Sequence, residues 1–153
     1  MHLARRDYEA AAAAYGLGVQ LGDRTAARAL PFAHHLNGLD SQALEAWIRL
    51  SALEISTGET EMVLREAYAR GSLEGATAAY LEALASRDGT PCTTTAHGGA
   101  RMLALMGDSD RMLACLDQSI EEHFVDWLAK VHPIYDPYRD DPRFQAHLRR
   151  IGL

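Results

Sequence analysis

The chain has 153 residues, of which 48% are hydrophobic, and a formal net charge of -6. This length suffices for one domain with a sizeable core or for a short stack of helical repeats, and the acidity excludes a broadly basic, nucleic-acid-binding surface as the main function. A charged start and the lack of about 18 consecutive uncharged apolar residues exclude a visible signal peptide and a membrane span.

Apolar residues recur at three- and four-residue intervals through most of the chain, which predicts helices joined by turns throughout. The expected breaks, in chain order, are Leu21-Gly22-Asp23, Asn37-Gly38, Thr57-Gly58, Gly71, Gly89-Thr90-Pro91, Gly107-Asp108 and a proline-rich stretch over 133–142. The expected helix caps are Ser41, Thr57, Ser72, Thr93 and Ser109. These signals predict an all-α fold.

One pattern returns at a nearly constant interval: a turn residue, then a small residue, then an aromatic or large apolar residue one helical turn later. Its copies are Ala11 with Tyr15, Ala43 with Trp47 and Ala76 with Tyr80; a weaker fourth copy has Met112 at the small position, followed by Leu116 and Ile120. The turns before them, at Arg6, Gly38, Gly71 and Gly107, are 32, 33 and 36 residues apart. A small residue lets two helices approach closely and the larger one fills the gap to the next pair.

This pattern resembles the tetratricopeptide repeat family, whose units are helix-turn-helix pairs of about 34 residues. Residues 103–112 and 132–148 are similar to the C-terminal ends of such repeat regions in bacterial transcriptional regulators, adenylate cyclases and serine/threonine kinases. The first helices, near 27–34, 60–67 and 96–103, lack the family's tryptophan, and Pro31 lies inside one of them. The resemblance implies a curved stack of about three and a half hairpins over 1–132, and a proline-rich turn with a capping helix over 133–153.

The start of the chain matches a second helix of a repeat, with no first helix before it. Two explanations stay open: the chain is part of a larger bacterial regulator, or its N-terminal helix packs on a second copy in a homodimer. An uncapped repeat end exposes apolar surface, which favours the homodimer.

The resemblance also implies a concave groove lined by the first helix of each repeat. The groove residues that it implies are Arg28, Phe32, His35, Glu61, Arg65, Tyr68, His97 and Arg101. Three arginines with two aromatic rings can hold a carboxylate or an acidic peptide, because guanidinium binds carboxylate through two hydrogen bonds and stacks on rings. The alternative is that Arg65 pairs with Glu61 one turn before it and the other side chains are solvated or packed.

No set of residues forms a recognisable catalytic or metal motif. Cys92 with His97 lacks an orienting third group, and the adjacent His34 and His35 point to different faces of a helix. A metal cluster of His123 and Asp126, with Glu122 or His132, is less favoured than a group of helix-end charges. The sulfur-rich set Met102, Met106, Met112 and Cys115 is predicted to be core, as are Trp47 and Trp127. We therefore expect no catalytic residues, no metal and no cofactor.

Cys92 and Cys115 are too few for a disulfide framework, which predicts free thiols and a cytoplasmic location. The function we expect is binding of a protein or peptide by a non-catalytic adaptor, without nucleic acid or membrane. The alternative is a small-ligand-sensing domain of a bacterial transcriptional or cyclase regulator; a closed apolar pocket would favour it, whereas an open groove would favour peptide binding.

Overall fold

A computed structural model of the chain describes residues 2–55, 58–88, 92, 98–123 and 125–153. Every regular element in these ranges is helical, which confirms the predicted all-α fold. The chain divides into two compact units, Met1–Tyr80 (unit 1) and Leu81–Leu153 (unit 2). None of the helices in the described ranges has the length and apolar character to cross a membrane.

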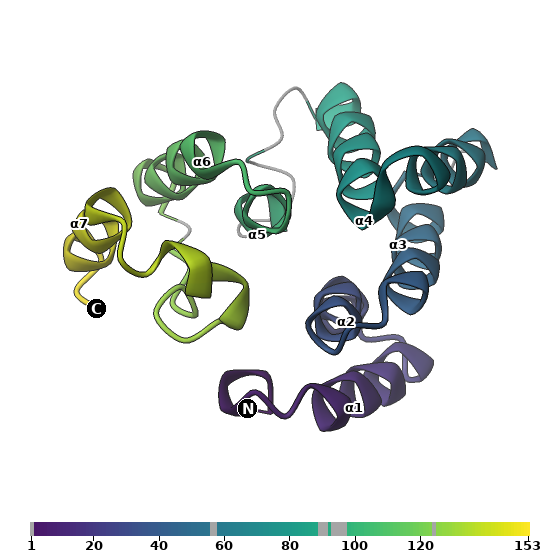
Figure 1. Ribbon diagram of the computed structural model, residues 1–153, viewed down its shortest axis with the longest axis horizontal. Coiled ribbons are helices and arrows are strands. Elements are labelled where there is room, and N and C mark those ends of the chain that lie inside the picture. The colour runs from purple at the N-terminus through teal and green to yellow at the C-terminus, as the bar shows by residue number, and fades with distance from the viewer. Residues whose placement is uncertain (1, 56–57, 89–91, 93–97, 124) are drawn as a thin grey trace. The chain divides into compact units, whose positions relative to one another are not determined.

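Unit 1 begins with a short helix, η1 (Leu3–Arg5), which sequence reasoning did not foresee. It continues with α1 (Tyr8–Gln20), α2 (Arg24–Leu36), α3 (Asp40–Glu54) and the first part of α4 (Gly58–Asp88). Consecutive helices pack side by side, α1 on α2 and α2 on α3 (Figure 1). Leu3 packs with Ala11 and Ala33, so η1 covers part of the α1 face.

The helix α4 is two helices that meet at a kink, as the break predicted at Gly71 requires. The backbone leaves the helical region at Gly71 (φ -146°) and at Ser72 (φ 72°, ψ -166°). The halves approach closely, because a Cβ at Gly75 would lie 2.9 Å from the Ala67 carbonyl oxygen. The helix-turn-helix pattern of the sequence is therefore kept, because the range labelled α4 comprises two helices joined at Gly71 and Ser72.

Glycines with positive φ end several helices, at the predicted breaks. Gly22 (φ 83°), Gly38 (φ 73°) and Gly107 (φ 77°) follow α1, α2 and α5. After α2, the Gly38 N–H donates to the His35 carbonyl (2.8 Å) and the Leu39 N–H to the His34 carbonyl (2.9 Å). These paired bonds satisfy the last carbonyls of the helix, in a conformation that glycine adopts without strain.

The residues that cap the helix starts differ from those predicted. Asp7, Asp23, Asp108 and Asp141 accept backbone N–H bonds at the starts of α1, α2, α6 and α7. Ser109 is the first residue of α6, Ser41 lies inside α3, and α3 begins after Leu39 without a side-chain cap. The prediction was wrong for Ser109, because Asp108 takes the capping position one residue earlier. It was wrong for Ser41, because no side chain caps α3. Thr57 and Thr93 lie outside the described residues.

The core of unit 1 is built from the repeated small and aromatic positions. Ala43, Ala76, Trp47 and Tyr80 are fully buried, and Ala11 is nearly so. The Trp47 ring lies 5.2 Å from Phe32, edge to face, and 5.1 Å from Tyr80. One aromatic from each of three helices thus fills the space between them, as the small-then-large spacing predicts.

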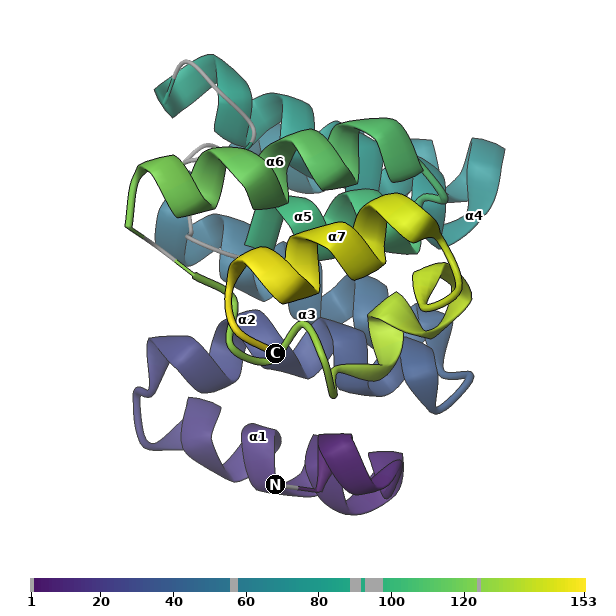
Figure 2. The same ribbon diagram turned by 90° about the vertical axis from the view of Figure 1, so that its left-hand side faces the viewer.

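Unit 2 contains the end of α4, then α5 (Gly98–Leu105), α6 (Ser109–Glu121), η2 (Pro133–Tyr138) and α7 (Pro142–Arg150). The helices α6 and α7 lie side by side (Figure 2), and η2 packs on α5. The core contains the sulfur-rich positions Met102, Met112 and Cys115, as predicted, whereas Met106 is half-buried. The end of the chain over 133–153 is therefore integral to unit 2.

The two cysteines are joined, which corrects the expectation of free thiols. A disulfide links Cys92 to Cys115 in α6, across a separation of 23 residues with the Cα atoms 5.0 Å apart. Linear spacing gave no sign of this contact, because it depends on the tertiary fold that brings the two positions together. The expected cytoplasmic location rested on free thiols, and the disulfide removes that basis.

Candidate functional site

The predicted groove residue Arg28, in α2, is engaged within unit 1. Its Nε donates to Glu54 Oε1 (2.7 Å), while the Tyr80 hydroxyl donates to Glu54 Oε2 (2.8 Å). The Glu54 side chain is 7% exposed and that of Arg28 43%. One buried carboxylate at the end of α3 therefore ties α2 to α4, and the guanidinium stays accessible to water on one side.

Arg65, Glu61 and Tyr68 lie in the first half of α4. The Arg65 guanidinium donates to both carboxylate oxygens of Glu45 in α3 (2.6 and 3.2 Å) and to Glu61 one turn earlier (3.0 Å). The Glu61 contact is the alternative that the sequence left open. Tyr68 is half-buried. Arg65 is already matched by two carboxylates, so an acidic ligand would have to displace one of them.

The two remaining predicted residues of unit 1 do not join a ligand surface. Phe32 is buried on Trp47, so its predicted place in a groove was wrong; its ring faces the core because α2 turns its apolar side to α3. His35 Nδ1 donates to Asp40 Oδ1 (2.8 Å) across the turn between α2 and α3. The predicted set is thus divided between core contacts and internal ion pairs.

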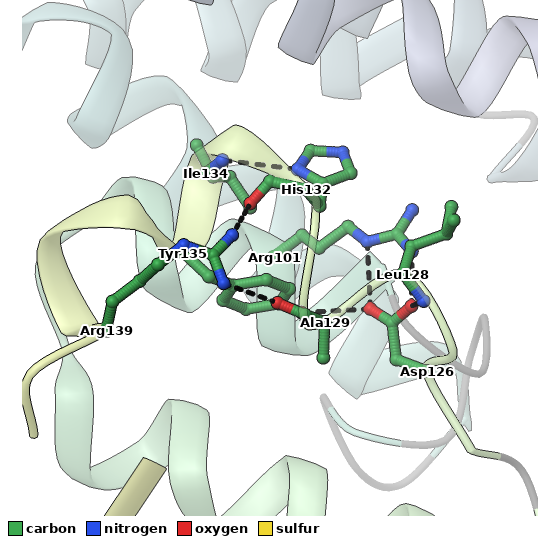
Figure 3. A network of polar contacts seen from close by, with 8 residues as sticks. All are labelled: Arg101, Asp126, Leu128, Ala129, His132, Ile134, Tyr135 and Arg139. Atoms are coloured by element: carbon green, nitrogen blue, oxygen red, sulfur yellow. Dashed lines mark hydrogen bonds and ion pairs between the residues drawn. The ribbon is translucent and has the colours of Figure 1, made fainter. Parts of the chain in front are cut away.

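Arg101 belongs to a buried polar network in unit 2 (Figure 3). Its Nε and Nη2 donate to the two carboxylate oxygens of Asp126 (3.1 and 2.7 Å), and its side chain is only 15% exposed. The predicted role of Arg101 as a groove residue is therefore wrong, because its side chain is mostly buried and pairs with Asp126 inside the unit. His97 lies outside the described residues.

Asp126 is the centre of this network. Besides Arg101, it accepts bonds from the Tyr135 hydroxyl (3.1 Å) and from the Leu128 N–H (3.0 Å). Burial, followed by the Asp126 charge, raises the pKa of Tyr135 well above its ordinary value, so the phenol keeps its proton and donates. Burial lowers the pKa of Arg101, but the charges and hydrogen bonds of Asp126 and Tyr135 together outweigh that effect, and the pKa is raised.

His132 and Arg139 extend the network toward η2 (Figure 3). The Ile134 N–H donates to His132 Nδ1 (3.2 Å), and Arg139 donates to the carbonyls of Ala129 (3.4 Å) and His132 (3.2 Å). Burial and then the Arg101 charge lower the pKa of His132 to about 3. The histidine is therefore neutral near pH 7, and Nδ1 serves as an acceptor.

The network fixes a turn that carries exposed apolar side chains. Trp127 is 65% exposed, Leu128 49% and Val131 44%. We call these three residues the apolar patch. Their backbone is held by a bond from the Leu128 N–H to Asp126 and by the bond of Arg139 to Ala129. The prediction that Trp127 packs in the core was wrong: residues 125–132 are not helical, so no buried helical face applies to them.

Unit 1 contains an open hollow of about 390 Å³ between α2 and α3. Its lining combines apolar side chains, Leu30, Leu44 and Ala46, with polar ones, His34, Ser41, Gln42, Glu45 and Arg49. His34 Nδ1 is buried and has no hydrogen-bond partner, and Arg49 makes no hydrogen bond or ion pair with the described residues. Sequence reasoning missed this site, because the periodicity of α2 and α3 does not show where the side chains of two packed helices leave a hollow.

The other candidates do not converge on a reactive centre. His123 is exposed while Asp126 is buried in its network, and among the described residues no three metal-ligating side chains come together. His147 Nδ1 bonds to Asp117 (3.2 Å), which also accepts from Arg150 (2.7 Å), so this histidine ties α7 to α6.

Comparison with protein-family models, with curated proteins and with solved structures gives no match. The resemblance to tetratricopeptide repeats therefore stays a prediction from the sequence pattern.

Proposed function

We propose that this chain is a non-catalytic binding module, built like tetratricopeptide repeats, that docks a protein or peptide segment on the apolar patch of unit 2. The observation that carries the proposal is the 65% exposure of Trp127 on a turn fixed by a buried network. Tryptophan is enriched among the residues that dominate binding energy, and a rigid surface loses little entropy when it binds.

The chemistry of the patch indicates the kind of segment that fits. Trp127, Leu128 and Val131 offer apolar contact, and Lys130, the lone lysine of the chain, is exposed among them. A partner with large apolar side chains and an acidic residue matches both features. The acidic ligand predicted from the sequence is thus kept, but its contacts move from the paired arginines Arg28, Arg65 and Arg101 to Lys130.

The proposal is tested by selecting random peptides on the purified chain and measuring their affinities for variants. Trp127→Ser is expected to weaken the selected peptides about 30-fold, since a central tryptophan is worth about 2 kcal/mol or more. Lys130→Ala should weaken peptides that contain acidic residues and spare neutral ones. The matched control is Leu53→Ser, which changes an exposed leucine of unit 1.

Two results would refute the proposal. Selected peptides that bind Trp127→Ser as tightly as wild type would place the docking surface elsewhere. Recovery of no peptide that prefers wild type over Trp127→Ser would remove the patch as a binding site.

Self-association through α1 is a second candidate, supported by Leu17 and Leu21, which are exposed near the end of that helix. Sedimentation velocity over a range of concentrations distinguishes it from peptide binding. A dimer that dissociates in Leu17→Ser/Leu21→Ser supports it, whereas a monomer at every concentration refutes it.

A further inference from the structure

We propose that the hollow between α2 and α3 of unit 1 is a binding site for a small organic carboxylate with an apolar body. It shares no residue with the apolar patch of unit 2, so it is independent of the protein-binding function proposed above. The hollow, of about 390 Å³, falls within the size range of small-molecule sites.

Arg49 is the permanently charged cation among the side chains that line the hollow. Glu45 lines it, but both of its carboxylate oxygens are taken by Arg65 (2.6 and 3.2 Å). Asp40, at the start of α3, is held by His35 (2.8 Å). Arg49 makes no hydrogen bond or ion pair with the described residues, and its charge helps to lower the pKa of Glu45 after the larger effect of Arg65, so the N–H donors of Arg49 stay open.

His34 adds no second charge. Burial and then the Arg49 charge lower its pKa, so the imidazole is neutral near pH 7. Its Nδ1 is buried without a hydrogen-bond partner in the described part of the chain. The hollow therefore presents a guanidinium with open N–H donors beside an unsatisfied ring nitrogen, which is an arrangement that a bound polar group stabilises.

The geometry of the donors suits a carboxylate. A guanidinium offers two parallel N–H groups to the two oxygens of a carboxylate, and the Ser41 hydroxyl and Gln42 amide add neutral donors on the first turn of α3. That turn follows Leu39, which provides no side-chain cap, and its one carboxylate, Asp40, is hydrogen-bonded to His35.

The rest of the lining determines the body of the ligand. Leu30, Leu44 and Ala46 are buried in the unit and contribute the apolar part of the hollow. These three side chains are only 5–8% exposed, so they offer van der Waals contact and leave little apolar area for a ligand to remove from water. A short apolar chain or ring with one carboxylate thus satisfies both parts of the site, whereas a phosphate ion satisfies only one.

Benzoate is the probe, and benzamide, which has the same shape without charge, is its matched control. Both are titrated into the full chain at constant ionic strength, and backbone amide chemical shifts are followed by NMR. Benzoate is expected to shift the Ser41 and Gln42 amides and to bind about tenfold or more tightly than benzamide.

Variants assign the selectivity to the hollow. Arg49→Gln should reduce the preference for benzoate over benzamide to about one, because the charged fork is lost. Arg24→Gln changes another exposed arginine of the same unit and should leave the preference intact. Ser41→Ala, which keeps Arg49, should weaken benzoate by a smaller factor.

The proposal fails if benzoate and benzamide bind equally, if neither shifts the α3 amides up to the solubility limit, or if Arg49→Gln keeps the wild-type preference. None of these outcomes bears on the apolar patch of unit 2, because peptide binding to that patch is measured separately.

Discussion

Each unit of this chain encloses a carboxylate held by an arginine and a tyrosine. In unit 1, Glu54 accepts from Arg28 and Tyr80; in unit 2, Asp126 accepts from Arg101 and Tyr135. The arginine precedes the carboxylate by 26 residues in the first case and by 25 in the second. The same three kinds of side chain therefore link helices in both units.

The two clusters differ in how much water they can reach. Arg28 is 43% exposed, while Arg101 is 15% exposed and Asp126 only 1%. A charge that stays near water loses little when its partner is removed, whereas a buried charge without its partner pays the full cost of desolvation. Neutralising the carboxylate of each cluster is thus expected to destabilise the two units by different amounts.

The largest effect is expected from neutralising the two carboxylates. Asp126→Asn should destabilise unit 2 by about 4 kcal/mol, because Arg101 is left buried and uncompensated. Glu54→Gln should destabilise unit 1 by about 1 kcal/mol, because Arg28 turns to solvent. Urea denaturation, monitored by circular dichroism, measures the loss in the free energy of unfolding. Hydrogen exchange of peptides from each unit shows in which unit the loss occurs.

A double variant, Arg101→Leu/Asp126→Leu, is the control for the buried pair. Removal of both charges should recover part of the stability lost in Asp126→Asn, because no unpaired charge is left inside. Equal losses in Asp126→Asn and Glu54→Gln would contradict the role assigned to burial.

The disulfide is the next difference between the units, since the two cysteines of the chain, Cys92 and Cys115, both belong to unit 2. Closing a loop of 23 residues stabilises a folded unit by about 3 kcal/mol in the chain-entropy model. Reduction should therefore speed hydrogen exchange in α5 and α6 and leave α1 to α3 unchanged. A Cys92→Ser/Cys115→Ser variant should no longer respond to reductant, and faster exchange in both units of wild type would contradict a local effect.

Acidification should also destabilise the two units by different amounts, because of His132. Its pKa is about 3 in the folded chain against 6.5 ordinarily, so below pH 6.5 the unfolded chain binds a proton that the folded chain does not. Acidification therefore favours unfolding, and unit 2 should lose about 2 kcal/mol between pH 7 and pH 5. In unit 1, His34 has its pKa lowered in the same direction but is only partly buried, which predicts a smaller loss.

Urea denaturation at both pH values tests this difference. His132→Asn keeps an acceptor for the Ile134 N–H and removes the titration, so its stability should depend less on pH by about the same 2 kcal/mol. Retention of the full wild-type pH dependence in this variant would assign the acid sensitivity to other groups. Arg101, Asp126, Asp136 and Arg139 are the charges that act on His132.

The regular helices and most of the turns follow from local rules that a sequence displays. Small residues at Ala43 and Ala76, with aromatics four residues later, predicted which faces meet, and glycines marked the turns. The polar contacts of Arg101 and the exposure of Trp127 depend on residues 125–132, which have no periodicity to interpret. The hollow and the disulfide depend on distances between helices, and linear spacing does not contain these.

The smallest expected effect concerns the turn inside α4, the one turn described above where a serine takes the positive φ. Ser72 has φ 72° and ψ -166°, a region open almost only to glycine, while the comparable turn of unit 2 uses Gly107 (φ 77°). Ser72→Gly should therefore raise the stability of unit 1 by about 1 kcal/mol, and Gly107→Ser should lower that of unit 2 by a similar amount. Urea denaturation of both variants, beside wild type, measures the pair. A loss in Ser72→Gly would mean that the contact of the Ser72 hydroxyl with Glu74 stabilises the kink by more than the backbone strain costs.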